Sequence, residues 1–281
     1  MGKIKFSPLN LDEWKATRDT LHKYCKMVGT IREKISSPQP HWWHISLRIT
    51  EDGITTLPLP KSFEEKDKTF EVKLDLVNRK LIIIPSYSET MQIALTGQSL
   101  SALCDETCSL LSDIGISPPI ERPSFIDGKP GKFEGQYLRN YWAALKNINN
   151  VFQEFKSKLK GKTSPVQLWP HHFDLAFSWF SGRLIPGKDQ SNPEESQEQM
   201  TFGFSTGDET IREAYFYATA YPTPEGLLYS SLPTDAFWNK DGFVGAVMKY
   251  HSLNEVKFAS KKLSGFLSAV HSAGSRLMPN N

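Results

Sequence analysis

The sequence lacks an excess of charge of either sign. Its 33 lysine and arginine residues nearly balance its 31 aspartate and glutamate residues, which leaves a formal net charge of +2. Proteins that bind the phosphate backbone of nucleic acids, or anionic membrane surfaces, usually concentrate positive charge. The composition therefore gives no electrostatic reason to expect either partner, and we expect neither nucleic acid nor a membrane.

Long apolar runs and a disulfide framework are also lacking. The longest aliphatic run covers residues 81–84, whereas a membrane-spanning helix needs about 20 apolar residues. The first residues show no apolar core of an export signal. The three cysteines, Cys25, Cys104 and Cys108, form an odd and sparse set, which favours reduced thiols. We therefore expect a soluble, cytoplasmic protein.

No motif for a common cofactor or an activated nucleophile is present. Residues 202–208 carry two glycines and an aspartate, but they read as a strand end and a turn. A phosphate-binding loop would need a helix start directly after them, and the pattern indicates none. No serine lies in the context of a nucleophile elbow. The sequence therefore identifies no cofactor, and no motif by itself indicates a reaction.

What the sequence does contain is alternation typical of antiparallel strands, interleaved with helical spacing. In residues 69–76, for example, apolar side chains alternate with charged ones, as in a sheet with one covered face. The predicted fold class is α+β, with helices on one face of each sheet. The expected helices are residues 11–34, 99–114, 136–160 and 254–272, and the expected strands are residues 41–49, 54–58, 69–76, 79–84, 171–179, 201–205, 213–221 and 243–250.

The same order of elements occurs twice. Shifting residues 12–47 by 128 positions gives seven identities in 36 positions, among them His44 with His172, whereas ordinary composition gives about two. We therefore predict a tandem duplication that forms one compact, pseudo-symmetric unit. The first repeat would span residues 1–116 and the second residues 135–281, joined by a connection rich in proline and glycine at 117–134.

The densest cluster of side chains suited to a functional site lies in residues 169–179. A strand over 171–179 would place His171 on the covered face, where a histidine is usually a hydrogen-bonded core residue. His172, Asp174 and Ser178 would then lie on the opposite face, because side chains alternate along a strand. The second half of the chain is therefore the expected location of the site.

A second strand, residues 213–221, would complete that site. Glu213, Tyr215, Tyr217 and Tyr221 alternate with small and apolar side chains, so they share one face of the strand. Amphipathic tyrosine rings are well suited to line a cleft for a small molecule. We expect these tyrosines and Ser178 to bind the substrate.

Three interpretations of the acidic and histidine residues stay open. His172 and Asp174 could bind a divalent metal such as zinc, manganese or iron, with Glu213 as a further carboxylate. The same residues could form a histidine and carboxylate pair for proton transfer. They could also form a hydrogen-bonded network that only ties strands together.

The motif WPHHFDLA at 169–176 resembles one found in a family of mainly bacterial proteins that is catalogued only as a domain of unknown function, and the segments 202–205, 214–218 and 221–226 extend the resemblance over essentially the whole chain. The resemblance implies a soluble protein of bacterial type, without a known activity or cofactor. Our leading hypothesis is a small-molecule enzyme, such as a metal-assisted hydrolase or lyase, with His172, Asp174 and Glu213 as catalytic residues. The alternatives are a non-catalytic protein that binds a small ligand in the same cleft, and a protein interaction module. The oligomeric state does not follow from the sequence.

Overall fold

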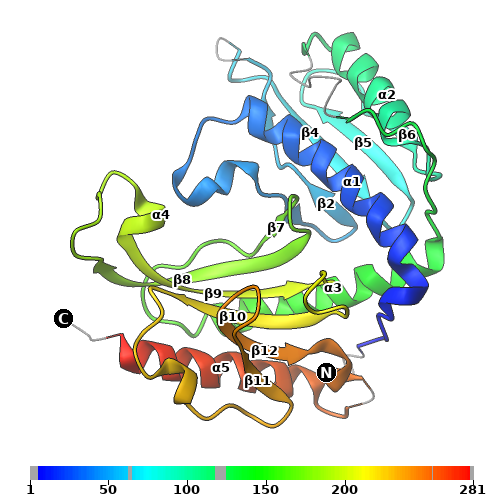
Figure 1. Cartoon of the computed structure of the whole chain (residues 1–281). Coiled ribbons are helices and arrows are strands. Elements are labelled where there is room, and N and C mark those ends of the chain that lie inside the picture. Colours follow the sequence, from blue (N-terminus) through cyan, green and yellow to red (C-terminus); the bar gives the residue numbers. More distant parts are fainter. Residues whose placement is uncertain (1–5, 63–64, 118–124, 255, 279–281) are drawn as a thin grey trace. The chain divides into compact units, whose positions relative to one another are not determined.

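A computed structural model describes residues 6–62, 65–117, 125–254 and 256–278 of the chain (Figure 1). The chain divides into two compact units, each of which combines helices with an antiparallel sheet. The predicted α+β class is therefore confirmed. Unit 1 consists of residues 1–11, 143–167 and 174–281, and unit 2 consists of residues 12–142 and 168–173.

Unit 2 is built around a six-stranded sheet. Five of its strands follow the order β1–β2–β4–β5–β6, and the sixth strand, β3, also pairs with β4. In β4, Phe70, Val72 and Leu74 are fully buried while the residues between them are half-buried, as the alternation predicted. Helix α2 begins after Ser99, whose hydroxyl accepts a hydrogen bond from the Ala102 amide at 3.2 Å, an arrangement that caps the helix. The elements are α1 (Leu11–Ile35), η1 (Pro40–Ile45), β1 (Arg48–Ile49), β2 (Gly53–Thr55), β3 (Leu59–Pro60), β4 (Thr69–Asp75), β5 (Lys80–Pro85), β6 (Met91–Ala94) and α2 (Leu100–Asp113).

The predicted strand at 41–49 is wrong over most of its length. Residues 40–45 form the short 3-10 helix η1, in which His41 and Trp42 have φ values of 54° and 56°. Pro40, which has no amide hydrogen, lies in the first turn of η1, a position that proline tolerates. The Gln39 amide donates to His44 Nδ1 at 3.1 Å, so local hydrogen bonds replace those of a sheet. The alternation of residues 41–49 therefore does not describe two faces of a strand.

Unit 1 is built around the second sheet, whose strand order is β11–β12–β10–β9–β8–β7. Phe155 of α3 packs edge-on against Phe202 of β9, and Gly274 of α5 lies close to Met200 of the same strand. Figure 1 shows α5 running along this sheet. The elements are α3 (Gly135–Lys156), β7 (Gln167–Trp169), β8 (Asp174–Leu184), α4 (Pro193–Ser196), β9 (Gln197–Ser205), β10 (Tyr215–Tyr221), η3 (Leu227–Tyr229), β11 (Ala236–Asn239), β12 (Gly245–Lys249), η4 (Tyr250–Leu253) and α5 (Ala259–Leu277). Residues 135–142 of α3 and 168–169 of β7 are assigned to unit 2.

The boundaries between the two compact units differ from the boundaries of the predicted repeats. The first residues belong to unit 1, where the Tyr250 hydroxyl donates to the Ser7 carbonyl at 2.9 Å. Of the predicted connection, residues 118–124 lie outside the described residues, and residues 125–134 belong to unit 2. The tandem duplication stays a prediction.

Candidate functional site

The histidines of the predicted motif lie in a turn, not in a strand. Residues 170–173 form this turn, which the Phe173 amide closes by donating to the Trp169 carbonyl at 2.8 Å, and β8 begins only at Asp174. His171 and His172 are both exposed. The predictions that His171 is a core residue and that His172 shares a strand face with Asp174 are therefore wrong. Phe173 has a φ of 59°, a left-handed conformation that a non-glycine residue rarely adopts and that ends the predicted alternation.

His22 of α1 binds this turn. Its Nε2 lies 3.0 Å from the Pro170 carbonyl oxygen and 3.1 Å from that of His171, and its ring stacks on Phe173. Because a carbonyl oxygen can only accept, Nε2 must carry the proton. Burial, followed by the positive charge of Lys26, lowers the pKa of His22 to about 4. A neutral imidazole therefore holds the turn in unit 2.

The structure does bring Asp174 and Tyr217 together. Tyr217 of β10 lies opposite Gly203 of β9, which in turn lies opposite Ala176 of β8, so these positions share one face of the sheet. A side chain at Gly203 would place its Cβ 2.2 Å from Tyr217 Cζ, because the tyrosine ring lies over the glycine. The ring thereby spans β9, and its hydroxyl donates to Asp174 Oδ2. Alternation predicted the face of each strand separately, and the pairing of both strands with β9 brings Asp174 and Tyr217 to the same face.

Tyr215 forms a second phenol and carboxylate pair on the same face. Its hydroxyl donates to Asp208 Oδ2, and its ring stacks on Phe243 with an interplanar angle of 14°. Burial and the adjacent carboxylates raise the pKa values of both Tyr215 and Tyr217. Both phenols therefore stay protonated at neutral pH and act as hydrogen-bond donors.

The other predicted binding residues lie apart from these pairs. The hydroxyl of Ser178 lies 2.9 Å from that of Thr201, so it links β8 to β9. Tyr221 ends β10 and is 38% exposed.

Glu213 precedes β10, and its two carboxylate oxygens have separate partners. Lys249 Nζ lies 2.6 Å from Oε1, and His251 Nδ1 lies 2.6 Å from Oε2. Burial raises the pKa of Glu213, but the hydrogen bonds and charges of Lys249 and His251 outweigh it and lower the pKa overall. An ionised carboxylate can only accept, so Nδ1 of His251 donates and Nε2 is left with its lone pair while the ring is neutral. This geometry is that of a histidine and carboxylate pair for proton transfer.

Sequence reasoning missed His251 because it follows the last residues of the predicted strand at 243–250. What brings His251 into the site is the pairing of β12 with β10, in which Lys249 lies opposite Tyr215. Two residues further on, His251 lies near Glu213, two residues before Tyr215. The strand order that sets this pairing was not predictable from one sequence.

Lys249 and His251 line an open cavity of unit 1 with a volume of about 630 Å³. Lys262 lies in the same wall, where Nζ donates to Asp235 Oδ2 at 2.6 Å and to the Ser252 carbonyl at 2.9 Å. The cavity therefore combines ammonium groups, an imidazole and an aromatic ring. The complete lining is Asp235, Ala236, Phe237, Lys249, His251, Ser252 and Lys262.

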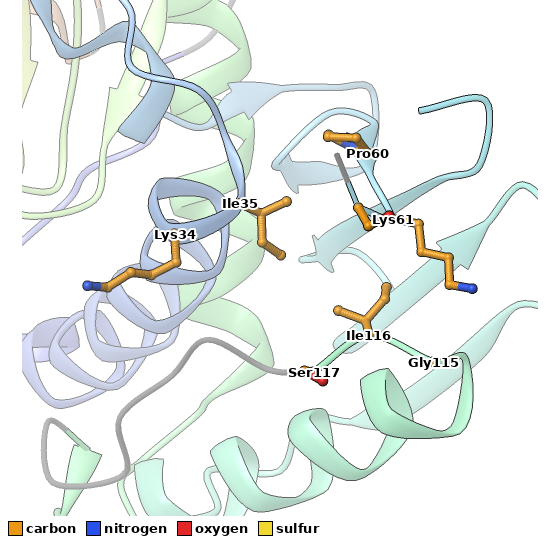
Figure 2. A pocket seen from close by; sticks show the side chains of 8 residues that line it. Lys34, Ile35, Pro60, Lys61, Gly115, Ile116 and Ser117 are labelled. Atoms are coloured by element: carbon orange, nitrogen blue, oxygen red, sulfur yellow. The ribbon is translucent and has the colours of Figure 1, made fainter. Parts of the chain in front are cut away.

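A second cavity, of about 320 Å³, lies in unit 2 between the end of α1 and the segments after β3 and α2. Figure 2 shows Ile35 and Ile116 on its inner side, whereas the ammonium groups of Lys34 and Lys61 extend in opposite directions. Its inner walls are apolar, and its described lining residues include no acid and base pair comparable to that of unit 1. The predicted cleft lined by Tyr215 and Tyr217 is neither of these two cavities and stays a prediction.

The predicted metal site finds no ligand set in the described part of the chain. Within those residues, no group of three or more histidine, cysteine, aspartate or glutamate side chains is arranged to hold a metal ion. Glu213 contacts Lys249 and His251, and His172 lies in the exposed turn. The structure thus offers no support for the zinc, manganese or iron alternative.

Three comparisons with known proteins complete the description. A family model described as a family of unknown function (DUF5996) matches residues 6–280. Neither a curated protein nor a solved structure matches the chain. Among the described residues, no helix has both the length and the apolar character needed to cross a membrane.

Proposed function

Because the chain belongs to the DUF5996 family, whose function is unknown, we propose a function from the geometry of unit 1 itself. In this proposal the cavity of unit 1 binds a small molecule with an anionic oxygen group, and His251 with Glu213 transfers a proton to or from it. The contact of 2.6 Å between His251 Nδ1 and Glu213 Oε2 at the cavity carries the proposal. The hydrolase or lyase class predicted from the sequence fits, since both reactions need such a transfer.

The two members of the pair have different surroundings that suit different roles. The side chain of His251 is 63% exposed, so its Nε2 can reach a molecule in the cavity. Glu213 is 34% exposed, and its lowered pKa keeps it ionised at neutral pH. An ionised carboxylate fixes the imidazole tautomer and stabilises the imidazolium that forms when Nε2 accepts a proton. His251 is the proposed base, and Glu213 orients it.

The proposed preference for an oxygen anion rests on the unused N–H donors of two lysines and not on an excess of positive charge, because Glu213 and Asp235 offset their charges. An ammonium group has three donors; Lys249 directs one to Glu213, and Lys262 directs two to Asp235 and the Ser252 carbonyl. Each lysine therefore retains a donor for a ligand oxygen. Phe237, which is 41% exposed in the same lining, offers an aromatic surface to an apolar part of the ligand.

Binding is tested by titrating phenyl phosphate, which has an anionic group and a ring, and recording the NMR signals of the histidine rings. We expect the signals of His251 to shift saturably and those of the exposed His172 to stay in place. The double substitution Lys249→Met and Lys262→Met should weaken the affinity at least tenfold, because it removes both ammonium donors. If phenyl phosphate shifts neither His251 nor the Phe237 ring, the cavity is not the binding site.

The proton-transfer step is tested with mono-p-nitrophenyl succinate, an activated ester that also carries the anionic carboxylate that the proposal requires. General acid and base catalysis contributes about 10²- to 10⁴-fold, so His251→Gln should reduce turnover by about 100-fold or more. His172→Gln is the matched control, since it removes another exposed histidine and should leave turnover unchanged. Turnover that survives in His251→Gln would contradict the role of His251 as base, whereas saturable binding of phenyl phosphate without any turnover by the wild type would support the predicted non-catalytic binding protein.

A further inference from the structure

Unit 2 contains two thiols whose sulfur atoms lie close together. Cys104 and Cys108 are four residues apart in α2, so they lie on the same face of that helix. Both are buried, with exposed fractions of 2% and 9%. Their Sγ atoms are 3.9 Å apart, and no disulfide joins them. The helix therefore holds two neighbouring sulfur donors away from bulk solvent.

The two side chains converge on a common point. Positions four apart in a helix have Cβ atoms about 5–6 Å from each other, yet the two sulfur atoms are separated by only 3.9 Å. A thiolate sulfur bonds to a metal ion such as zinc at about 2.3 Å. One ion of that size can therefore bond to both sulfur atoms while α2 stays helical.

A bridging ion fits this helix better than a direct disulfide bond. A disulfide needs Cβ atoms about 3.5–4.5 Å apart, which is closer than a spacing of four residues along a regular helix allows. Cys104 and Cys108 both lie inside α2, which runs on to Asp113. The pair is therefore better suited to binding an ion than to oxidation.

The number and type of donors limit which ion can bind. In the part of the chain that the structure describes, no group of three or more histidine, cysteine, aspartate or glutamate side chains could hold a metal ion. Structural zinc almost always takes four ligands, so two sulfur atoms do not satisfy it. Thiolate is a soft ligand that selects Cu(I), and Cu(I) forms stable complexes with only two sulfur donors. Cu(I) is therefore the ion that this pair suits.

We propose that Cys104 and Cys108 bind one Cu(I) ion through both sulfur atoms. Each thiol releases its proton to solvent when its sulfur binds the ion, so the affinity should rise with pH. Cys108 is the more exposed of the two and lies toward the carboxyl end of α2, and helix ends open more readily than helix centres. The ion is expected to enter from that end. The site belongs to unit 2 and shares no residue with the cavity proposed in unit 1.

Cu(I) itself is the probe, supplied without oxygen as its complex with the coloured chelator bicinchoninate. The wild type should withdraw one ion per chain, and the loss of colour gives the affinity. Cys104→Ala and Cys108→Ala should each weaken the affinity by at least about tenfold, since even the loss of an outer-shell partner typically costs a metal site that much. Cys25→Ala is the matched control, because it removes the third thiol, which is fully buried in α1, and should leave the affinity unchanged.

X-ray absorption at the copper edge tests the ligands in the wild type, so the proposal does not depend on the folding of a variant. We expect sulfur atoms in the first shell of the ion. A shell of nitrogen atoms alone would overturn the inference and place the ion on histidines, such as the exposed His171 and His172. Failure of the wild type to withdraw Cu(I), or a wild-type affinity in either Cys104→Ala or Cys108→Ala, would overturn it as well.

Discussion

At the scale of single residues, the polar face of the second sheet depends on one position without a side chain. Gly203 leaves the space over β9 that the Tyr217 ring crosses to reach Asp174. A glycine can be required by a left-handed backbone or by close packing. Gly203 does not have a left-handed backbone, so close packing is the reason here. The face is therefore filled by rings and hydrogen bonds around this position.

Gly203→Ala should destabilise the protein by about 1–3 kcal/mol, the usual cost of overpacking a well-packed site. The added Cβ would lie 2.2 Å from Tyr217 Cζ, so the ring would have to move away from Asp174. Urea unfolding at equilibrium measures the change. Gly265→Ala is the control, because nothing lies within 4 Å of its added Cβ in α5, and alanine there should stabilise the helix by up to about 1 kcal/mol. Equal stability of the two variants would contradict this account of the glycine.

The residues of the site were only partly predictable. Asp174 and Tyr217 could each be assigned to the polar face of its own strand, because period-two alternation holds where strands are regular, but the strand order that unites the two faces could not be predicted. His251 could not be identified, since its importance depends on which distant residues surround it. A sequence shows that a histidine follows a strand, but not that the carboxylate of Glu213 lies beside it.

At the scale of elements, the turn at 170–173 depends on an imidazole from a distant helix. His22 donates to two carbonyl groups of the turn and must stay neutral for its burial to be tolerated. Most of the predicted strand 41–49 and the first three residues of the predicted strand 171–179 are not strands, and both stretches contain non-glycine residues with positive φ. A non-glycine residue rarely adopts a positive φ, so tertiary contacts must hold these residues in that conformation. The sequence does not reveal those contacts, because its apolar and polar residues still alternate as in a strand.

Acid should weaken the protein through His22. Its pKa is about 4 in the folded state and about 6.5 when unfolded, so between these values the unfolded chain binds more protons. Stability therefore rises with pH across this window, and the contribution is lost as pH falls through it. With partial exposure taken into account, the effect is roughly 1–2 kcal/mol.

Denaturant unfolding at pH 4.5 and pH 7 measures this contribution. His22→Gln, which retains an N–H donor but cannot titrate, should reduce the difference in stability between the two pH values. His172→Gln serves as the control and should keep the wild-type difference. His271, whose pKa burial also lowers, should supply a residual slope in both variants. An unchanged slope in His22→Gln would contradict the role given to His22.

At the scale of the whole molecule, the described chain forms two compact α+β units, and only part of this organisation could be predicted. The fold class followed from alternation and helical spacing, which depend on local burial. The division into units did not follow, because residues 6–11 pack with the second half of the chain. Contacts between segments more than 200 residues apart leave no pattern in a single sequence.

Phe6→Ala tests this long-range packing. Phe6 is 2% exposed and packs against Tyr250 with ring centroids 6.0 Å apart, so truncation should cost about 3–5 kcal/mol. Hydrogen exchange should show that β10 and β12 of unit 1 lose protection. Phe258→Ala, at a position that is 57% exposed, should change the stability by less than about 1 kcal/mol. A loss of protection confined to unit 2 would contradict the assignment of the first residues to unit 1.

The most direct test of the central claim is the tautomer of His251, read from the nitrogen chemical shifts of its ring above pH 8. If Glu213 orients the imidazole as proposed, wild-type His251 carries its proton on Nδ1 and leaves Nε2 unprotonated toward the cavity. Glu213→Ala should remove this preference without changing the signals of His172. A neutral wild-type His251 protonated on Nε2 would contradict the claim, because it could not then accept a proton from a molecule in the cavity.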